Sequence, residues 1–133
     1  MKFDVSAVIL TMGDRPEALK DSIKSIRMQE DNDVEVIVVW NGISPDQSID
    51  AEIHIHSDVN VGIPSGRNLG ASKASRDLIL FLDDDARLLD PELLSKVQET
   101  FDADKSIAIT SLRIIDEDGL TARRHIPRLG SKS

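Results

Sequence analysis

Hydrophobic and polar positions alternate along this chain in two different periods, which predicts strands and helices in turn. Apolar runs at 5–10 and 34–40 are typical of buried strands, and the alternating segment 53–56 is typical of a half-exposed edge strand. Apolar residues recur at helical spacing over 19–26, so a helix with one apolar face is expected between the first two strands. This order indicates βαβ units and a parallel sheet.

Residues that favour helix starts help to place the helices. Asp14 is expected to cap the first helix, with Pro16 in its first turn, where a backbone N–H is not needed. A second helix is expected over 65–74, after Pro64. Asp90 and the proline that follows it predict a third helix, whose apolar side would hold Leu93, Leu94, Val97 and Phe101.

The last part of the chain has a weaker pattern. We expect a strand over 106–115, a turn over 116–119 and a returning hairpin arm over 120–126. The end of the chain is locally basic. No internal repeat or linker is visible, so residues 1–133 are expected to form a single domain.

The apolar run at 78–82 and the acidic residues after it are the strongest candidate for chemistry. We expect this run to be a strand buried on both faces of the sheet. Asp83, Asp84 and Asp85 follow at its carboxyl end, the edge where open α/β sheets bind ligands. Their mutual repulsion is relieved most simply by Mg²⁺ or Mn²⁺. The alternative, a solvated acidic turn, is less favoured after a fully apolar strand.

Glycines at four-residue spacing mark the second helix. Glycine costs about 1 kcal/mol in a helix interior relative to alanine, so Gly62, Gly66 and Gly70 need a reason. They fall on roughly one face, which permits close approach of either the sheet or a ligand. Arg67 lies beside this face and is a candidate partner for an anionic group such as phosphate.

The two histidines of the predicted edge strand are a weaker candidate. His54 and His56 share one strand face and could bind a metal. No third ligand lies nearby in the sequence, so surface histidines are the favoured interpretation.

Composition excludes several classes of protein. The net charge of −8 argues against a nucleic-acid binder, which normally shows a basic face. The absence of cysteine excludes a disulfide framework and a thiolate metal site. No segment approaches the ~20 apolar residues of a transmembrane helix, and Asp4 makes the N-terminus unlike a signal peptide. A cytoplasmic protein is therefore expected.

Five blocks of sequence, in order, resemble family 2 glycosyltransferases of the GT-A fold. They are 5–11, the helix after it, 36–42, 60–70 and 81–85, and together they span nearly the whole chain. The resemblance implies an α/β, Rossmann-like GT-A fold with a mostly parallel sheet flanked by helices. It implies that residues 1–105 are the donor-binding core and that 106–133 lead toward an acceptor part. The chain is therefore expected to be truncated at its C-terminus.

The resemblance also assigns roles to individual residues. The acidic triplet matches the DxD motif of the family, which implies Asp83 and Asp85 as metal contacts and Asp84 near the ribose or the diphosphate. Trp40 stands where many members have an Asp that reads the base, and an indole can stack on a base but cannot accept its N–H. The implied nucleotide-sugar-binding residues are Thr11, Asp14, Arg15, Trp40, Asn41, Arg67, Asp83 and Asp84. The catalytic base is expected beyond residue 133.

The implied reaction is inverting transfer of a sugar from a nucleotide-diphosphate donor to an acceptor that the sequence does not identify: a glycan, a lipid or a small molecule. A Mn²⁺ or Mg²⁺ ion would neutralise the charge that develops on the leaving diphosphate. An exposed sheet edge in such a fragment predicts a dimer or larger assembly.

Three other functions are alternatives to this one. A non-catalytic nucleotide- or partner-binding module with a GT-A-like fold is the main alternative. A phosphoryl-transfer enzyme is disfavoured because the chain has no Gly-x-x-x-x-Gly-Lys-Ser/Thr loop. A Rossmann dehydrogenase is disfavoured because 11–14 stand where Gly-x-Gly-x-x-Gly should follow the first strand.

Overall fold

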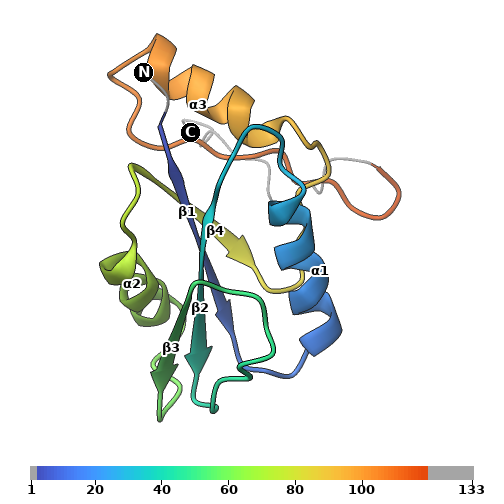
Figure 1. Cartoon of the computed structure of the whole chain (residues 1–133), viewed down its shortest axis with the longest axis vertical. Helices are drawn as coiled ribbons and strands as arrows, with labels where there is room; N and C mark the ends of the chain where they lie inside the picture. Colours follow the sequence, from blue (N-terminus) through green and yellow to red (C-terminus); the bar gives the residue numbers. More distant parts are fainter. Residues whose placement is uncertain (1–2, 120–133) are drawn as a thin grey trace, which may run out of the picture.

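The computed structural model describes residues 3–119, in which strands and helices alternate except that β3 follows β2 directly (Figure 1). The elements are β1 (Val5–Thr11), α1 (Pro16–Arg27), β2 (Glu35–Asn41), β3 (Ile53–Ser57), α2 (Ile63–Lys73), β4 (Leu78–Asp83) and α3 (Leu93–Ala103). The predicted βαβ pattern is confirmed. Among the helices of the described residues, none combines the length and the apolar character that a bilayer span requires.

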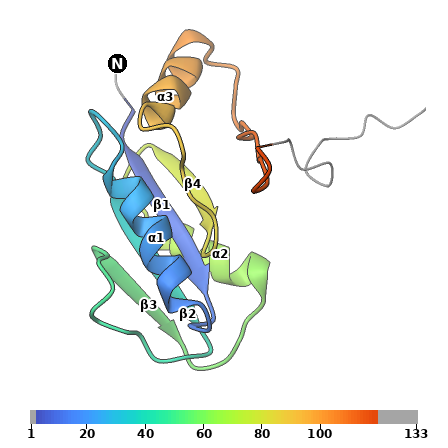
Figure 2. The same ribbon diagram turned by 90° about the vertical axis from the view of Figure 1, so that its right-hand side faces the viewer.

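The four strands form one parallel sheet in the order β3-β2-β1-β4. Strand β1 is central, and its Ile9 lies opposite Val38 of β2 on one side and Leu82 of β4 on the other. Helix α1 covers one face of the sheet and α2 covers the other (Figure 2). Because all strands run the same way, the loops that follow β1, β2 and β4 leave from the same edge.

The larger part of the hydrophobic core lies between α1 and the sheet. Leu19, Ile23 and Ile26 of α1 are buried there, as the helical spacing predicted. They pack with inward-facing residues of the two central strands, which include Ala7, Ile9, Val36, Val38 and Trp40.

On the opposite face, glycines bring α2 close to the sheet. A Cβ added at Gly66 would lie 2.5 Å from Cδ1 of Leu10, and one added at Gly70 would lie 2.2 Å from Cγ1 of Val8. These two positions confirm the packing interpretation of the glycine spacing. Gly62 does not share that face: it is the N-cap of α2, with φ +83° and nothing within 4 Å of an added Cβ.

Strand β4 differs from its prediction. Its residues alternate between partly buried and exposed, and Ile79 and Phe81 are 41% and 46% exposed. The expectation of burial on both faces is wrong because β4 lies at the edge of the described sheet, while α2 packs over β1 and β2. The other face is packed against the core through Leu78, Leu80 and Leu82.

Two smaller predictions also fail, and one holds. Asp14 does not cap α1; Arg15 is the N-cap residue, and no side chain bonds to the helix start. Residues 106–115 do not form the predicted strand: within the described residues they join none of the four strands of the sheet, and Ile115 alone is an isolated bridge residue. The turn over 116–119 is present, closed by a 2.9 Å hydrogen bond from the Gly119 N–H to the Asp116 carbonyl. The predicted arm 120–126 lies outside the described residues.

Asp90 lies in the turn just before the third helix, which begins at Leu93 with Glu92 as its N-cap residue, slightly later than expected. The Asp90 carboxylate accepts a hydrogen bond from the Glu92 N–H, and the Asp90 carbonyl accepts one from the Leu93 N–H. On the predicted apolar side of α3, Leu94 is buried and Leu93, Val97 and Phe101 are partly buried.

Candidate functional site

The acidic triplet is anchored to the end of the neighbouring strand β1. Thr11 Oγ1 donates a hydrogen bond of 2.8 Å to Asp84 Oδ2. Thr11 Oγ1 also accepts one of 3.1 Å from the Gly13 N–H, which ties the β1–α1 loop to the same point. The last residue of β1 therefore sets the position of the middle carboxylate.

Arg15 from the same loop spans two carboxylates of the triplet. Its Nη2 lies 2.7 Å from Asp84 Oδ1, and its Nη1 lies 2.7 Å from Asp85 Oδ2. The Asp84 side chain is 5% exposed, whereas those of Asp85 and Arg15 are each 50% exposed. The arrangement gives one buried and one accessible carboxylate, both held by one guanidinium.

The first carboxylate of the triplet is held by another arginine. Arg67 Nη2 of α2 donates to Asp83 Oδ1 over 3.1 Å, and its guanidinium lies 5.9 Å from the centroid of the Phe81 ring. Asp14 completes the cluster at its rim, 4.0 Å from Nε of Arg15. Two arginines from separate elements thus meet a concentrated set of carboxylates.

The buried carboxylate of Asp84 has an altered proton affinity. Burial raises the pKa of Asp84 above its ordinary value, and the nearby charges of Asp85 and Asp14 act in the same direction. The hydrogen bond from Thr11 and the charge of Arg15 lower this pKa but do not fully offset the burial. Removal of the Thr11 hydroxyl or of the Arg15 charge is therefore expected to raise the pKa of Asp84 further.

Helix α1 also holds the loop that follows the triplet. The buried hydroxyl of Ser22 donates a hydrogen bond to the Ala86 carbonyl, and Ser25 Oγ accepts one of 3.0 Å from the Leu88 N–H. Sequence reasoning missed both serines, because a polar residue on a predicted amphipathic helix carries no sign of which loop it contacts.

The end of β2 is tied to the loop that leads into α2. The Asn41 amide donates to Asn60 Oδ1 over 2.9 Å and accepts from the Val61 N–H over 2.9 Å. Asn60 Oδ1 in turn accepts a hydrogen bond from the N–H of Gly62, the N-cap of α2. The predicted site residue Asn41 is thus buried and positions this loop, and Asn60 is its unforeseen partner.

Trp40 is buried at the end of β2, beside Thr11 in the register. Its Nε1 donates to His54 Nδ1 over 3.0 Å, and the two rings stack with centroids 6.0 Å apart. The indole also forms part of the wall of a cavity of about 100 Å³ beside the β1–α1 loop. This cavity is lined by Gly13, Pro16, Leu19, Trp40, Ile43, Ser44, Asp46 and Ile49.

The donor groups of the triplet suit a hard divalent cation. Asp83 and Asp85 have side chains that are 68% and 50% exposed, so their oxygens are accessible. Mg²⁺ commonly binds through one or two carboxylates and completes its shell with water and substrate phosphates. Within residues 3–119, no three His, Cys, Asp or Glu side chains are grouped as metal ligands. His54 bonds Trp40 instead, and His56 lies 3.5 Å from Asp58.

The structure thus divides the predicted site residues into two groups. One group meets at the acidic triplet: Thr11, Asp14, Arg15, Arg67, Asp83, Asp84 and Asp85. The other group, Trp40 and Asn41, ends the adjacent strand and contacts β3 and the loop before α2.

This architecture is the α/β, Rossmann-like GT-A fold, and solved structures of TarS from S. aureus share it. TarS 1–349 matches with a TM-score of 0.63 and 21% identity, over 75% of this chain and 32% of that one. Full TarS gives a TM-score of 0.61 and 21% identity, over 75% and 20%. TarS 1–349 in complex with UDP-GlcNAc gives 0.63 and 21%, over 75% and 31%. The chain therefore spans about a third of the length of TarS 1–349.

A sequence model of one protein family also matches. The family is described as glycosyl transferase family 2, and the match covers residues 6–132. The chain belongs to this family. A search of curated proteins finds no significant match.

Proposed function

We propose that this chain binds a nucleotide-diphosphate sugar and is the donor-binding part of an inverting glycosyltransferase of the hexosyltransferase type. The observation that carries the proposal is the meeting of Arg15 and Thr11 with Asp84 and Asp85 at the carboxyl edge of the sheet. This edge is where open α/β sheets bind ligands. Family membership and the UDP-GlcNAc complex of TarS, a protein of the same fold, support the proposal.

Asp83 and Asp85 are the residues that would hold a Mn²⁺ or Mg²⁺ ion. When bound, such an ion supplies positive charge that stabilises the departing diphosphate. The exposed carboxylate oxygens of these two residues are the hard ligands that it prefers.

The arginines would bind the phosphates of the donor. Arg15 and Arg67 lie on two sides of the triplet, and a guanidinium can donate two parallel hydrogen bonds to phosphate oxygens. Asp84, which Thr11 holds in a fixed position, would face the ribose or the diphosphate. Asp14 at the rim would contact the nucleoside.

The nucleoside would extend toward the end of β2. The cavity that Trp40 lines is mostly apolar and adjoins Gly13, whose N–H bonds to the same Thr11 hydroxyl that anchors Asp84. Apolar walls with a few polar groups are typical of ligand pockets. Asn41 would keep the adjoining loop in place.

The acceptor would be a glycan, a lipid or a small molecule, and it would approach from the sugar end of the donor. We also propose that the protein is located in the cytoplasm.

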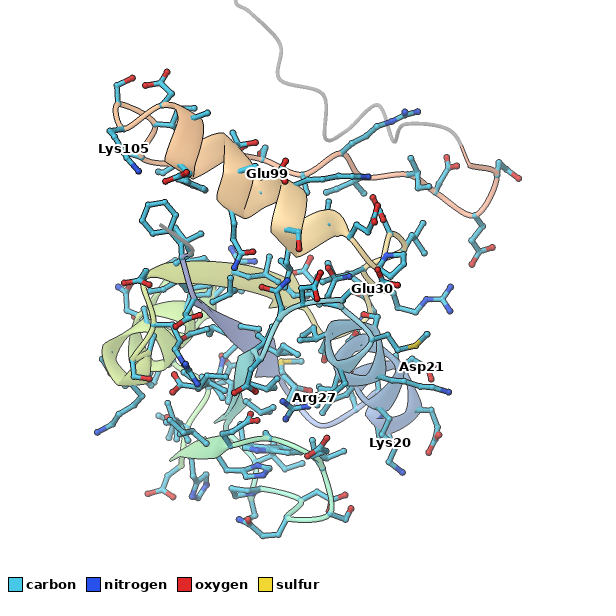
Figure 3. The ribbon with its side chains drawn as sticks, turned by 45° about the horizontal axis from the view of Figure 1, so that its top comes forward. Lys20, Asp21, Arg27, Glu30, Glu99 and Lys105 are labelled. Carbon is cyan, nitrogen blue, oxygen red and sulfur yellow. The ribbon has the colours of Figure 1, made fainter. Side chains whose placement is uncertain are left out.

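Thermal unfolding with UDP, GDP, dTDP and ADP, each with Mn²⁺ or with chelator, tests this function. Ligand at 100 times its Kd adds about 2.7 kcal/mol, which raises the Tm by several degrees. We expect a shift that metal enlarges, and we expect Asp85→Asn to remove that metal-dependent increase. Asp21→Asn, an exposed charge change on α1 (Figure 3), is the matched control and should keep the shift.

A second assay separates an enzyme from a binding module. The full-length protein should transfer labelled sugar to an acceptor or hydrolyse the donor slowly. If it binds donor but does neither, the chain is a binding module. If no nucleotide shifts the Tm of the full-length protein, the proposed function is wrong.

A further inference from the structure

We infer that Arg15 is an exchangeable counter-ion of Asp85, which makes tight metal binding conditional on the arrival of a diphosphate. The inference rests on the proposed function and adds an order of events to it. In the free protein Arg15 holds Asp85. When donor binds, the Nη1 end of Arg15 turns to the diphosphate while Asp84 keeps the other end, which leaves the Asp85 carboxylate to the metal.

The two ends of the Arg15 bridge are unequal. At one end, Nη2 bonds Asp84, which is nearly inaccessible and is also fixed by the Thr11 hydroxyl. At the other end, Nη1 bonds Asp85, where both side chains are half exposed. Within residues 3–119, Arg15 is the one hydrogen-bond partner of the Asp85 side chain. The bond to Asp85 is therefore the one that can open while Asp84 keeps the guanidinium in place.

A cation at Asp85 competes directly with this arginine. Nη1 already occupies Asp85 Oδ2, and a divalent ion on the second oxygen would lie within a few ångströms of the guanidinium charge. Like charges this close repel strongly at a partly buried site. The free protein is thus expected to bind metal weakly.

A diphosphate reverses this balance. Its negative charge attracts both the metal ion and the Arg15 guanidinium, and its oxygens match the paired N–H donors of a guanidinium. Arg15 is half exposed, so its Nη1 end can reach a ligand without repacking of the core. Metal and diphosphate then bind cooperatively, and each raises the affinity of the other by the same factor.

The Arg67 pair offers an internal comparison. Within residues 3–119, Arg67 reaches only Asp83, through one hydrogen bond of 3.1 Å, and the two side chains are 43% and 68% exposed. Among the described residues it bridges no second carboxylate, so its replacement is expected to affect metal binding less than the replacement of Arg15.

The test measures Mn²⁺ binding to the purified chain without nucleotide, by electron paramagnetic resonance of free Mn²⁺. Arg15→Gln is expected to bind Mn²⁺ about tenfold more tightly than the wild type, within the usual range of coupling between sites. A merely structural Arg15 predicts the opposite, because a disordered Asp85 would bind metal less well. Lys20→Gln, which removes an exposed positive charge one turn further along α1 (Figure 3), should match the wild type.

A second measurement follows the diphosphate. UDP and GDP binding is measured by calorimetry in the presence of chelator, so that metal makes no contribution. Arg15→Gln is expected to weaken this binding, and the factor by which nucleotide tightens Mn²⁺ binding should fall relative to the wild type.

The outcomes separate the inference from the function beneath it. If the wild type binds nucleotide and metal but Arg15→Gln binds Mn²⁺ alone no more tightly, the inference is overturned and the proposed function stands. If the full-length wild type binds no nucleotide, both are overturned. Arg15→Lys decides if the Gln variant does not fold: lysine keeps the charge but lacks the two-ended planar fork that holds Asp84 and Asp85 together, so a smaller gain in the same direction is expected, and no gain overturns the inference.

Discussion

Thr11 donates a 2.8 Å hydrogen bond to Asp84, although 73 positions separate the two residues. The bond joins the carboxyl ends of two adjacent strands, β1 and β4. It lies in a buried environment where an unpartnered carboxylate oxygen is costly. The candidate site and the sheet that supports it are therefore energetically coupled at this point.

Thr11→Val tests that coupling. Valine keeps the shape and the strand preference of threonine but removes the donor, so we expect a loss of about 1–3 kcal/mol in the free energy of unfolding. Urea denaturation measures it. Thr100→Val, at an exposed threonine of α3 whose hydroxyl donates to the Lys96 carbonyl, should change stability by less than about 0.5 kcal/mol. Equal effects of the two changes would contradict the assigned role of Thr11.

Glu52 should contribute to stability at neutral pH and not in acid. Its burial works against the charged form, but hydrogen bonds from Arg27 and from the Val36 N–H outweigh this and lower its pKa. A lowered pKa in the folded state gives stability above the ordinary value of 4.5, which is lost as pH falls through the folded pKa. Arg27 lies at the end of α1 (Figure 3).

Unfolding of Glu52→Gln at several pH values checks this sign. The variant should be less stable than the wild type at pH 7, and the difference should shrink below the ordinary Glu pKa. The exposed Glu17→Gln is the matched control for the loss of a surface carboxylate. A difference for Glu52→Gln that grows toward acid would refute the prediction.

The charge on Asp84 should lower the free energy of unfolding as pH rises, the opposite of the effect expected for Glu52. A folded-state pKa above the ordinary value means that Asp84 binds its proton more tightly in the folded protein. The free energy of unfolding should therefore fall as pH rises from the ordinary Asp pKa through the higher folded-state pKa. We expect Thr11→Val to extend this pH range upward, because it removes a hydrogen bond that lowers the pKa of Asp84. Carboxyl ¹³C shifts of Asp84 followed by NMR titration report the change, and an unchanged titration midpoint would refute it.

Gly70→Ala should destabilise the fold despite the higher helix propensity of alanine. The new Cβ would lie 2.2 Å from Val8 Cγ1 and 3.1 Å from Val39 Cγ2, so α2 must move away from the sheet. Overpacking of this kind costs about 1–3 kcal/mol or more. Asn68→Ala, at an exposed position of the same helix, should be neutral or slightly stabilising. Chemical denaturation compares the two, and a stable Gly70→Ala would argue against the tight packing.

The exposed face of β4 predicts self-association. Ile79 and Phe81 present apolar surface beside a strand edge with no strand partner among residues 3–119. Sedimentation at increasing concentration should reveal dimers or larger species, and Ile79→Thr with Phe81→Thr should reduce them with little loss of stability. Lys96→Gln is a surface control. A monomer at high concentration would overturn this expectation.

Periodicity in the sequence was sufficient for the central elements. Leu19, Ile23 and Ile26 share one helical face that any amphipathic helix on a sheet must bury, so α1 could be placed before its neighbours were known. The same reasoning failed for β4, because an apolar run does not reveal whether helices cover both of its faces. Ile79 and Phe81 are exposed owing to the position of α2, which no local pattern encodes.

The candidate site was predictable in its members but not in their pairings. The Asp triplet follows an apolar strand, and this alone located it at a ligand-binding edge. The bridge from Arg15 to Asp84 and Asp85 depends on the register of β1 against β4, which local sequence does not specify. The bond between Trp40 and His54 likewise depends on the pairing of β2 with β3.

The serines of α1 have a mechanical consequence. Arg15 is the N-cap residue of this helix, and Ser22 and Ser25 within it form hydrogen bonds with the segment just after the triplet. Helix α1 therefore holds both the Arg15 guanidinium and the acidic loop. A tilt of α1 would carry both together, so the spacing between arginine and carboxylates should survive distortions that would pull apart a site built on separate loops.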